Sequence, residues 1–164
     1  MRSFLNILVA EDNDDDVVLL QHAFKKSATT SRVQVVCNGL LAVAYLKGEG
    51  AYGDRSEHPF PDILLLDLNM PRMNGFEVLE WVRRDSRCNL LVVHILTASS
   101  RQADVQRAYE LRANSYVTKP SRVDELADFI KTLHNWHSFT CLPVPPTGAA
   151  NRTQAVFMNA KILA

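Results

Sequence analysis

The sequence lacks most of the features that mark disulfide-rich, membrane-spanning and nucleic-acid-binding proteins. Its 164 residues include only three cysteines, which lie far apart without a CxxC pair, so neither a disulfide framework nor a thiolate metal site is expected. Lysine plus arginine equals aspartate plus glutamate, at 18 each, and this balance indicates neither a nucleic-acid nor an anionic-membrane partner. No apolar run is long enough to span a bilayer, and the N-terminus lacks a secretory pattern. We therefore expect a cytoplasmic protein with one ordinary folded domain.

The chain is organised around residues 61–75, PDILLLDLNMPRMNG. The apolar run from Ile63 to Leu66 is too short for a helix, and it predicts a strand that is buried on both faces. Asp67 ends this run, and because a carboxylate is costly to bury deeply, we expect it at the open carboxyl end of the strand. A turn-rich loop follows as far as Gly75. Open α/β sheets bind ligands outside these strand ends, so Asp67 is the first candidate site residue.

Four more strands are predicted, and each of the five is followed by a helical pattern. The periodicity is clearest in the last helix, where Leu126, Ile130 and Leu133 recur on one face. The expected strands are residues 4–10, 33–37, 63–66, 90–96 and 114–118, and the expected helices start near residue 14, cover 40–47, 75–84 and 104–112, and end near 136. Such alternation implies a doubly wound α/β fold, with a parallel sheet, helices on both faces and right-handed crossovers.

The alternating pattern stops after Trp136. Prolines at residues 143, 145 and 146 and a glycine at 148 mark a linker, and residues 151–164 form a short tail. We therefore expect a folded domain over residues 1–137 and an extension over residues 138–164. The extension is too small to be an output domain.

The first predicted strand is followed by a run of acidic and amide residues, EDNDDD. Asn13 or Asp14 can cap the next helix, and acids in its first turn suit the helix dipole. We therefore interpret the acids from Asp14 to Asp16 as structural. Glu11 and Asp12 precede the helix at the strand end, which makes them better candidates for chemistry.

Potentially reactive side chains end four of the expected strands: Glu11 with Asp12, Asp67, Thr97 and Lys119. Because the carboxyl ends of parallel strands lie on one edge, we expect these groups to converge. Three neighbouring carboxylates call for a cation, and hard oxygen ligands suit Mg²⁺. A carboxylate can attack phosphorus, and positive charge from the metal and from Lys119 would neutralise the transferred group. His94 lies inside an apolar strand and is interpreted as a packed core residue, not as a ligand.

Three competing motifs do not fit. The spaced acids that begin at Asp12 mimic a calcium loop, but Val17 replaces the required glycine and Ala23 replaces the closing glutamate. The chain contains no GxxxxGK[ST] segment, which argues against a nucleotide-hydrolysing P-loop. A dehalogenase-type phosphatase needs DxDx[TV] after its first strand, and here the last position is Asp16.

Several short motifs together match one known family. They are the acidic pair Glu11-Asp12, the segment LLDLNMP at residues 65–71 with Gly75, Thr97-Ala98, and Tyr116 before Lys119-Pro120. In these residues the chain resembles the receiver domain of two-component response regulators, over residues 4–136. The loop at residues 48–60, the segment ANSYV at 113–117 and the stretch 136–143 are similar to small receivers paired with phytochrome-type histidine kinases. Glu11 stands where many members of the family carry aspartate.

The resemblance implies a flavodoxin-like sheet with strand order 2-1-3-4-5 and a phosphoryl acceptor at Asp67. The phosphoryl group would come from the phosphohistidine of a sensor histidine kinase. Asp12, Asp67 and the backbone carbonyl of Asn69 would hold Mg²⁺, and Glu11 would contact the ion through water.

The resemblance also implies roles for the residues around the acceptor. Thr97 and Lys119 would bind the phosphoryl oxygens. Thr97 and Tyr116 would form the switch, in which the hydroxyl moves toward the phosphoryl group and the ring turns inward. The Lys119-Pro120 peptide would be cis, an isomer that X-Pro bonds tolerate at low cost.

Two classes of function are compatible with these residues. The first is a single-domain response regulator, which is a phosphoacceptor with autophosphatase activity only and not otherwise an enzyme. The second is a metal-dependent phosphohydrolase, and a phosphate sink that drains a kinase is a third, minor possibility. The missing DxDx[TV] motif and the Lys119-Pro120 ending favour the first class.

A receiver without an output domain must signal through protein contacts. Tyr116 and Lys119 lie on the last strand, between the last two helices, so a turning ring at Tyr116 would alter this face. Receivers of this type commonly form a two-fold dimer there. We therefore expect a homodimer through the last two helices and the last strand, and no nucleic-acid or membrane partner.

Overall fold

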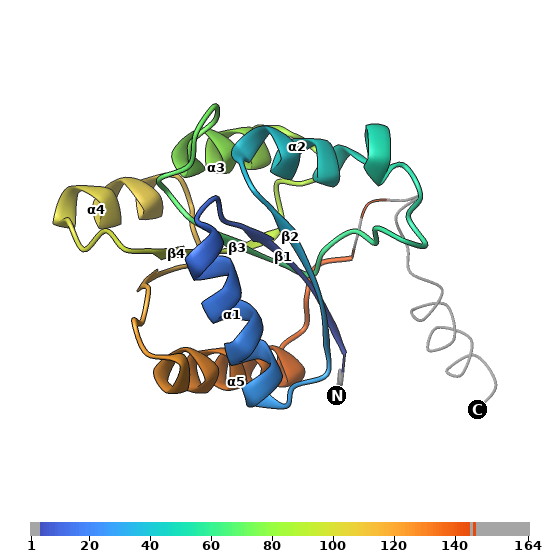
Figure 1. The fold of residues 1–164 in the computed structure, drawn as a ribbon. Coiled ribbons are helices and arrows are strands. Elements are labelled where there is room, and N and C mark those ends of the chain that lie inside the picture. Colours follow the sequence, from blue (N-terminus) through green and yellow to red (C-terminus); the bar gives the residue numbers. More distant parts are fainter. Residues whose placement is uncertain (1–3, 145, 147–164) are drawn as a thin grey trace.

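A five-stranded parallel sheet forms the middle layer of the protein in the computed structural model, which describes residues 4–144 and 146 (Figure 1). The strands are β1 (Leu5–Ala10), β2 (Ser31–Val36), β3 (Ile63–Leu66), β4 (Val92–Thr97) and β5 (Ser115–Thr118). The helices are α1 (Asp14–Ser27), α2 (Gly39–Lys47), α3 (Gly75–Arg84), α4 (Gln102–Glu110) and α5 (Val123–Phe139), with a short 3-10 turn η1 (Gly50–Tyr52). The strand order is β2-β1-β3-β4-β5, and all neighbours are parallel. The predicted fold class and strand order are confirmed.

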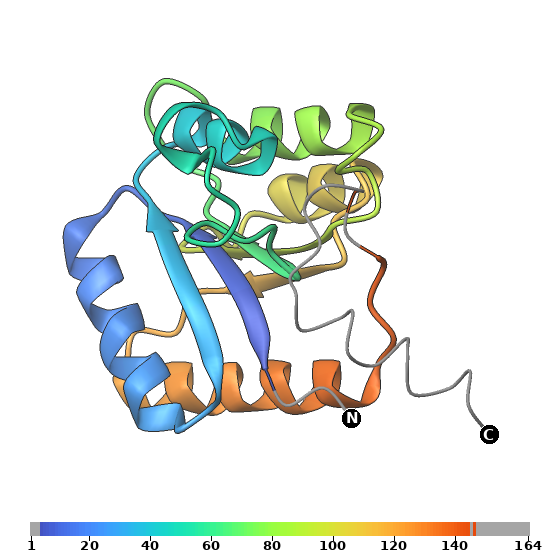
Figure 2. The ribbon, with the colours of Figure 1, turned by 90° about the vertical axis from the view of Figure 1, so that its right-hand side faces the viewer.

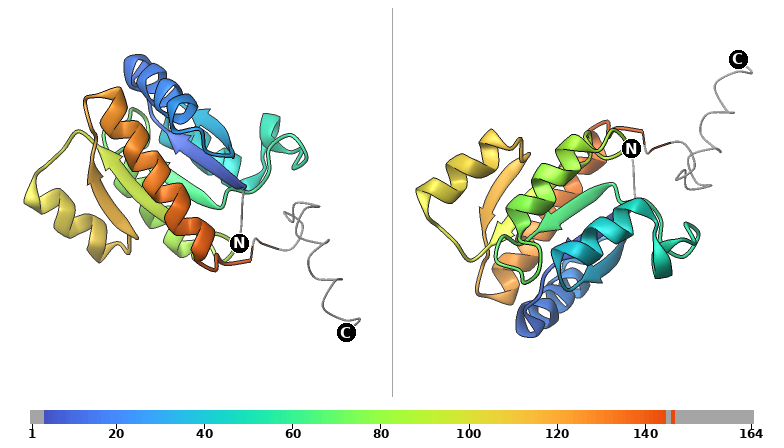
Figure 3. Two further views of the ribbon diagram at one scale, coloured as in Figure 1. Left: turned by 90° about the horizontal axis from the view of Figure 1, so that it is seen from below. Right: turned by 90° about the horizontal axis from the view of Figure 1, so that it is seen from above.

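Helices cover both faces of the sheet, as the alternating pattern predicts. α2, α3 and α4 lie on one face, and α1 and α5 lie on the other (Figures 1 and 2). α1 packs beside α5, and α2 packs beside α3 (Figure 3). The main contacts of α4 are with β5, at the edge of the sheet. Among the described residues, no helix combines the length and the apolar character needed to cross a bilayer.

The predicted bounds are correct for β3 and α3 and differ by a few residues elsewhere. β4 begins at Val92 and not at Leu90, because the turn after α3 leaves Leu90 exposed and closes with a hydrogen bond from Leu91 N to Cys88 O. α5 continues to Phe139, a few residues beyond the helix end predicted near residue 136. Within the predicted extension, residues 145 and 147–164 lie outside the described residues.

Asparagine side chains begin the first three helices. Asn13 caps α1 by accepting a hydrogen bond from Asp16 N, as predicted, and Asn38 caps α2 in the same way. Asn74 caps α3 within a reciprocal capping box with Glu77. These caps satisfy N–H groups that have no partner inside the helix. The cap at Asn74 matters for the site because it ends the loop that follows Asp67.

Gly75 brings the start of α3 back against the end of β3. A Cβ atom at this position would lie 2.2 Å from the backbone oxygen of Asp67 and 2.8 Å from Leu68 Cα. Gly75 N also donates to Leu68 O at 3.0 Å. No other side chain fits this close approach, so Gly75 sets the path of the loop around the site.

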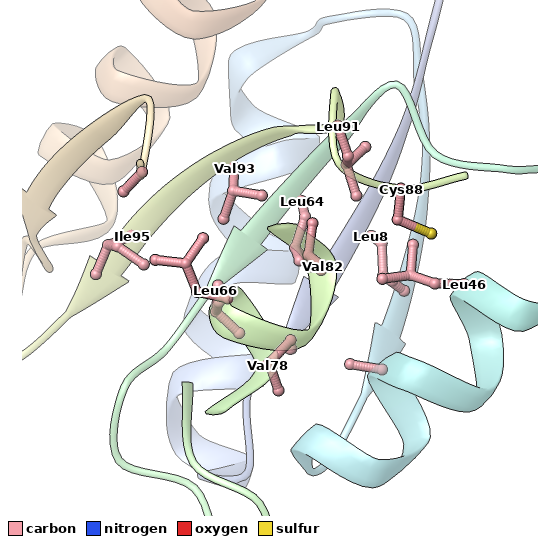
Figure 4. Packing of buried hydrophobic residues seen from close by; sticks show 14 of the residues in the cluster. Leu8, Leu46, Leu64, Leu66, Val78, Val82, Cys88, Leu91, Val93 and Ile95 are labelled. Carbon is pink, nitrogen blue, oxygen red and sulfur yellow. The ribbon is translucent and has the colours of Figure 1, made fainter. Parts of the chain in front are cut away.

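Two apolar clusters hold the sheet between its helices. The cluster in Figure 4 includes Leu8, Leu64, Leu66, Val93 and Ile95 from the strands, Leu46 from α2, Val78 and Val82 from α3, and Cys88 and Leu91 from the following turn. The second cluster joins the opposite face to α1 and α5. All four residues of β3 are at most 1% exposed. Burial of this apolar surface is the main stabilising term, and it makes β3 a rigid support for Asp67.

Candidate functional site

Three carboxylates gather at the carboxyl edge of the sheet. Glu11 and Asp12 follow β1, and Asp67 follows the neighbouring strand β3. A hydrogen bond of 3.0 Å from Asp67 N to Ala10 O continues the ladder beyond these strands. Carboxylate oxygens of Glu11, Asp12 and Asp67 consequently lie within 4.8 Å of one another. Glu11 and Asp67 are buried and Asp12 is more exposed, so the cluster opens to solvent at Asp12.

Lys119 brings positive charge to this cluster from the end of β5. Its Nζ donates to Glu11 Oε2 at 2.6 Å and to Asp16 Oδ2 at 2.7 Å, and it lies 4.0 Å from Asp67 Oδ1. Burial disfavours the ammonium, but the hydrogen bonds to Asp16 and Glu11 outweigh this effect and raise the pKa of Lys119. Burial raises the pKa of Glu11, although Lys119 opposes the shift. The backbone N–H of Lys119 donates to Thr97 O at 2.7 Å, which fixes the lysine beside β4.

Thr97 and Tyr116 lie on the neighbouring strands β4 and β5. Thr97 is fully buried at the end of β4, next to the strand that carries Asp67. The Tyr116 ring is half-buried against the core, and its hydroxyl donates to Ser99 O at 3.0 Å. The tyrosine therefore holds the loop that follows Thr97.

The same loop is tied to the start of α4. Ser99 Oγ donates to Asp104 Oδ2 at 2.5 Å, and Arg101 Nε donates to the same oxygen at 2.9 Å. These two donors lower the pKa of the Asp104 carboxyl and keep it charged. Sequence reasoning did not single out Asp104 or Arg101, because only the folded loop brings them to Ser99.

The loop after Asp67 wraps close to its carboxylate. Asn69 N donates to Asp67 Oδ2 at 3.2 Å, and Met73 N donates to Pro71 O at 2.8 Å. Asn69 is thus beside the acid cluster, two residues after the carboxylate. The role predicted for its backbone carbonyl as a metal ligand stays a prediction.

Asp16 takes part in the start of α1, as the structural interpretation predicts, and it also contacts a residue of the acidic site. Its backbone N–H does join the helix cap, but its side chain binds Lys119. Asp16, Leu20 and Ala23 are spaced i, i+4 and i+7, and the latter two are buried, so Asp16 lies on the face of α1 that packs against the sheet. That spacing is the sequence signal that could have identified it.

His94 is buried, as predicted. Its Nδ1 lies 2.6 Å from Ser115 Oγ, and its Nε2 lies 3.0 Å from His137 Nε2 in α5. In the part of the chain that the structure describes, His94 belongs to no group of three or more potential metal ligands.

The cis peptide implied for Lys119-Pro120 is not found. All described peptide bonds are trans. The trans isomer is the ordinary state of an X-Pro bond.

The site therefore combines a buried carboxylate at a strand end, further acidic oxygens suited to a divalent cation, and an ammonium group. These groups are suited to nucleophilic attack of a carboxylate on phosphorus, with the cation and the ammonium neutralising the charge of the transferred group. The model of the response regulator receiver domain matches residues 7–131, which include the acids and Lys119. The chain belongs to the response regulator receiver family.

Three relatives of this receiver illustrate the match. Response regulator Rcp1 of Synechocystis sp. is 33% identical over 138 residues, which are 84% of this chain and 92% of the relative. Its Mn²⁺-bound structure superposes with a TM-score of 0.74 and 32% identity, covering 85% of this chain and 99% of the other. Response regulator RPA3017 in red light signaling of R. palustris gives a TM-score of 0.80 and 33% identity, with coverages of 85% and 99%. The phosphorylated cyanobacterial phytochrome response regulator RcpA gives a TM-score of 0.77 and 34% identity, covering 86% of this chain and 99% of the other. The receiver is thus similar to phytochrome response regulators.

Proposed function

We propose that this protein is a single-domain response regulator that accepts a phosphoryl group on Asp67 from the phosphohistidine of a sensor histidine kinase. The observation that carries the proposal is the setting of Asp67. It is a buried carboxylate on a rigid strand end, within 4.8 Å of oxygens of Glu11 and Asp12, and 4.0 Å from the Lys119 ammonium. In this account residues 1–137 form the receiver domain, and residues 138–164 form an extension that is not an output domain.

Phosphoryl transfer uses Asp67 as the nucleophile. A carboxylate oxygen attacks phosphorus, a P–O bond forms, and the P–N bond to the donor histidine breaks with its electron pair left on the imidazole. Thr97 and Lys119 bind the phosphoryl oxygens. Thr97 ends β4, the neighbour of β3, and Lys119 follows β5, the neighbour of β4, so both residues lie at the same sheet edge as Asp67. Water later attacks the phosphorus, the P–O bond to Asp67 breaks, and inorganic phosphate leaves, which restores the carboxylate. This hydrolysis is the autophosphatase activity expected of the chain.

The carboxylate cluster fits Mg²⁺. Its oxygens lie close enough to share one ion, and hard oxygen ligands with solvent access at Asp12 suit magnesium, which retains several waters. Asp12, Asp67 and the Asn69 backbone carbonyl would hold the ion, and Glu11 would contact it through water. Bound Mg²⁺ supplies positive charge that offsets repulsion between the carboxylates and the incoming phosphoryl oxygens. The relative Rcp1 has an Mn²⁺-bound form, which supports binding of a divalent ion by this receiver as well.

The donor we propose is a phytochrome-type histidine kinase in the cytoplasm. The support is the set of relatives, which includes a phytochrome response regulator and a regulator of red light signaling. Phosphotransfer profiling against all histidine kinases of the source organism tests this choice. Preferred transfer from a kinase with no phytochrome photosensor would overturn it and leave the receiver chemistry intact.

We propose that the phosphorylated state is transmitted through a homodimer of α4, β5 and α5. Tyr116 lies on β5 within this face, and Tyr109, Trp136 and Phe139 are exposed on its two helices. Exposed aromatic side chains are favourable anchors for an interface. Light scattering with and without beryllofluoride tests the dimer, and a monomer in both conditions would contradict it.

One experiment separates the response regulator from a phosphohydrolase. The full chain is incubated with acetyl phosphate and Mg²⁺, and its intact mass is followed together with the release of inorganic phosphate. We expect the mass of one added phosphoryl group per chain, loss of this mass when EDTA is present from the start, and phosphate release no faster than decay of the phosphorylated chain. If a phosphate monoester is added in a parallel reaction, many rapid turnovers of it without a phosphorylated chain would favour the hydrolase. If the chain removes phosphoryl groups from a donor kinase but no other protein responds to the phosphorylated chain, the function is that of a phosphate sink.

A further inference from the structure

Lys119 has a carboxylate partner that none of the receiver motifs contains. Its Nζ lies 2.7 Å from Asp16 Oδ2 and 2.6 Å from Glu11 Oε2, but 4.0 Å from Asp67 Oδ1. The lysine that is expected to bind the phosphoryl group is therefore held by two other acids in this structure.

Both sides of the Lys119–Asp16 pair are held by rigid elements. The Asn13 side chain accepts from Asp16 N at 3.0 Å and so fixes the first turn of α1. The backbone of Lys119 is fixed by its hydrogen bond to Thr97 O. Asp16 and Lys119 are 103 residues apart in the sequence, so the pair exists because α1 and the end of β5 meet above the same sheet edge.

The two acids that hold Lys119 differ in how easily they can release it. Glu11 is 2% exposed, so its carboxylate needs a partner inside the protein. The Asp16 side chain is 33% exposed, so water can replace the ammonium there. Of the two bonds, the one to Asp16 is the one that can break when Lys119 moves.

We propose that Asp16 is a positioning residue that holds Lys119 away from Asp67 in the unphosphorylated protein. This inference rests on the proposed function. A phosphoryl oxygen on Asp67 competes with the Asp16 carboxylate for the same ammonium group. Asp16 therefore lowers the affinity of Lys119 for the phosphoryl group and biases the receiver toward its unphosphorylated conformation.

The test is a titration of the Mg²⁺-saturated full chain with beryllofluoride, followed by the amide NMR signals of residues 97–99 and 116. Asp16→Asn removes the competing charge, and we expect it to bind beryllofluoride roughly tenfold more tightly than the wild type, the effect of losing one charge-assisted hydrogen bond. Structural damage would weaken binding, so tighter binding separates positioning from a merely structural role. Asp16→Ser serves the same purpose if the asparagine variant does not fold.

Two further variants make the comparison specific. Asp15→Asn removes the same charge from the same helical turn, where the side chain is exposed, and it should stay within about twofold of the wild type, the size of a surface charge effect. Asp16→Glu restores the carboxylate and should return the affinity toward the wild-type value. Equal affinities of Asp16→Asn and Asp15→Asn, or weaker binding by both Asp16→Asn and Asp16→Ser, would overturn the inference. Failure of the wild type itself to bind beryllofluoride would overturn the proposed function, and the inference with it.

Discussion

Lys119 Nζ lies 4.0 Å from Asp67 Oδ1, beyond hydrogen-bonding distance although each side chain is only 7% exposed. The two groups form a long ion pair, in which the ammonium stabilises negative charge at Asp67 without a hydrogen bond to it. A small movement of Lys119 would bring it onto a group attached to Asp67. The site is thus prepared for an anion at this position.

Replacing Lys119 with methionine tests this relationship. Lys119→Met removes the positive charge but keeps a side chain of similar length, so Mg²⁺ affinity should be kept or increased by the freed acids. Phosphorylation should no longer produce its response at Tyr116, because the link between the phosphoryl group and β5 is lost. Calorimetry with Mg²⁺ and NMR of Tyr116 measure the two effects. Normal phosphate-dependent shifts at Tyr116 in this variant would contradict the role of Lys119.

The metal assignment depends on Asp12. In Asp12→Ala the cluster loses its most solvent-accessible ligand, and we expect Mg²⁺ affinity to fall by at least about tenfold, since a single ligand carboxylate contributes on the order of a charge-assisted bond. Calorimetry measures the change. Asp14→Ala is the control, because Asp14 is an exposed acid of the first turn of α1. Equal Mg²⁺ affinity in the two variants would place the metal elsewhere.

The Tyr116 hydroxyl should hold the loop after β4. Tyr116→Phe removes the hydrogen bond to Ser99 O, so amide exchange at residues 98–104 should become faster by the equivalent of about 1 kcal/mol of local stability. Labelling of Asp67 should persist, because Tyr116 is not one of the three carboxylates of the cluster. Tyr109→Phe, which changes an exposed tyrosine of α4, should leave both properties unaltered. Unchanged exchange in Tyr116→Phe would show that the bond does not support the loop.

The buried pair His94 and His137 predicts a loss of stability in mild acid. Burial, with the repulsion of a charged His137, lowers the pKa of His94 to about 4, and burial lowers the pKa of His137 as well. Between the ordinary histidine pKa of about 6.5 and about 4, the unfolded chain binds a proton that folded His94 does not. The free energy of unfolding should therefore fall with decreasing pH, by about 1.4 kcal/mol per pH unit from one histidine.

Urea unfolding between pH 7.5 and 5.5 measures this dependence, above the range in which most carboxylates titrate. His94→Leu removes the titrating group, so its slope with pH should be smaller than that of the wild type even if its stability is lower throughout. His22→Gln, at an exposed position of α1, should keep the wild-type slope. If the free energy of unfolding depends on pH equally in the wild type and in His94→Leu, the buried histidine pair does not cause the loss of stability in acid.

Much of the fold could be predicted because its strongest signals are local. The unbroken apolar run of β3 and the periodic face of α5 each point to one kind of element, and five repeats of strand and helix imply a parallel sheet. Strand ends on one edge then bring Glu11, Asp67 and Lys119 together without knowledge of any distance. The exact start of β4 could not be predicted, because apolar residues such as Leu90 continue beyond the paired strand into a turn.

The side-chain partners that the sequence did not predict depend on contacts that only the folded chain makes. Asp16 satisfies the local rule for a helix start, and only the meeting of α1 with the end of β5 shows that its side chain binds Lys119. The partner of His94 lies 43 residues away in α5. Asp104 likewise reaches Ser99 only after the loop between β4 and α4 has folded. Local patterns indicate which residues are reactive, whereas their pairing depends on the assembled sheet edge.

Chemical mapping of the acyl phosphate determines whether Asp67 carries the phosphoryl group. The chain is phosphorylated by acetyl phosphate or by a phosphorylated histidine kinase, treated with borohydride to convert aspartyl phosphate into homoserine, and digested for peptide mass spectrometry. We expect homoserine at position 67 in the wild type, and no phosphoryl incorporation in a folded Asp67→Asn variant. Homoserine at another aspartate, or undiminished incorporation in Asp67→Asn, would rule out Asp67 as the phosphoryl acceptor.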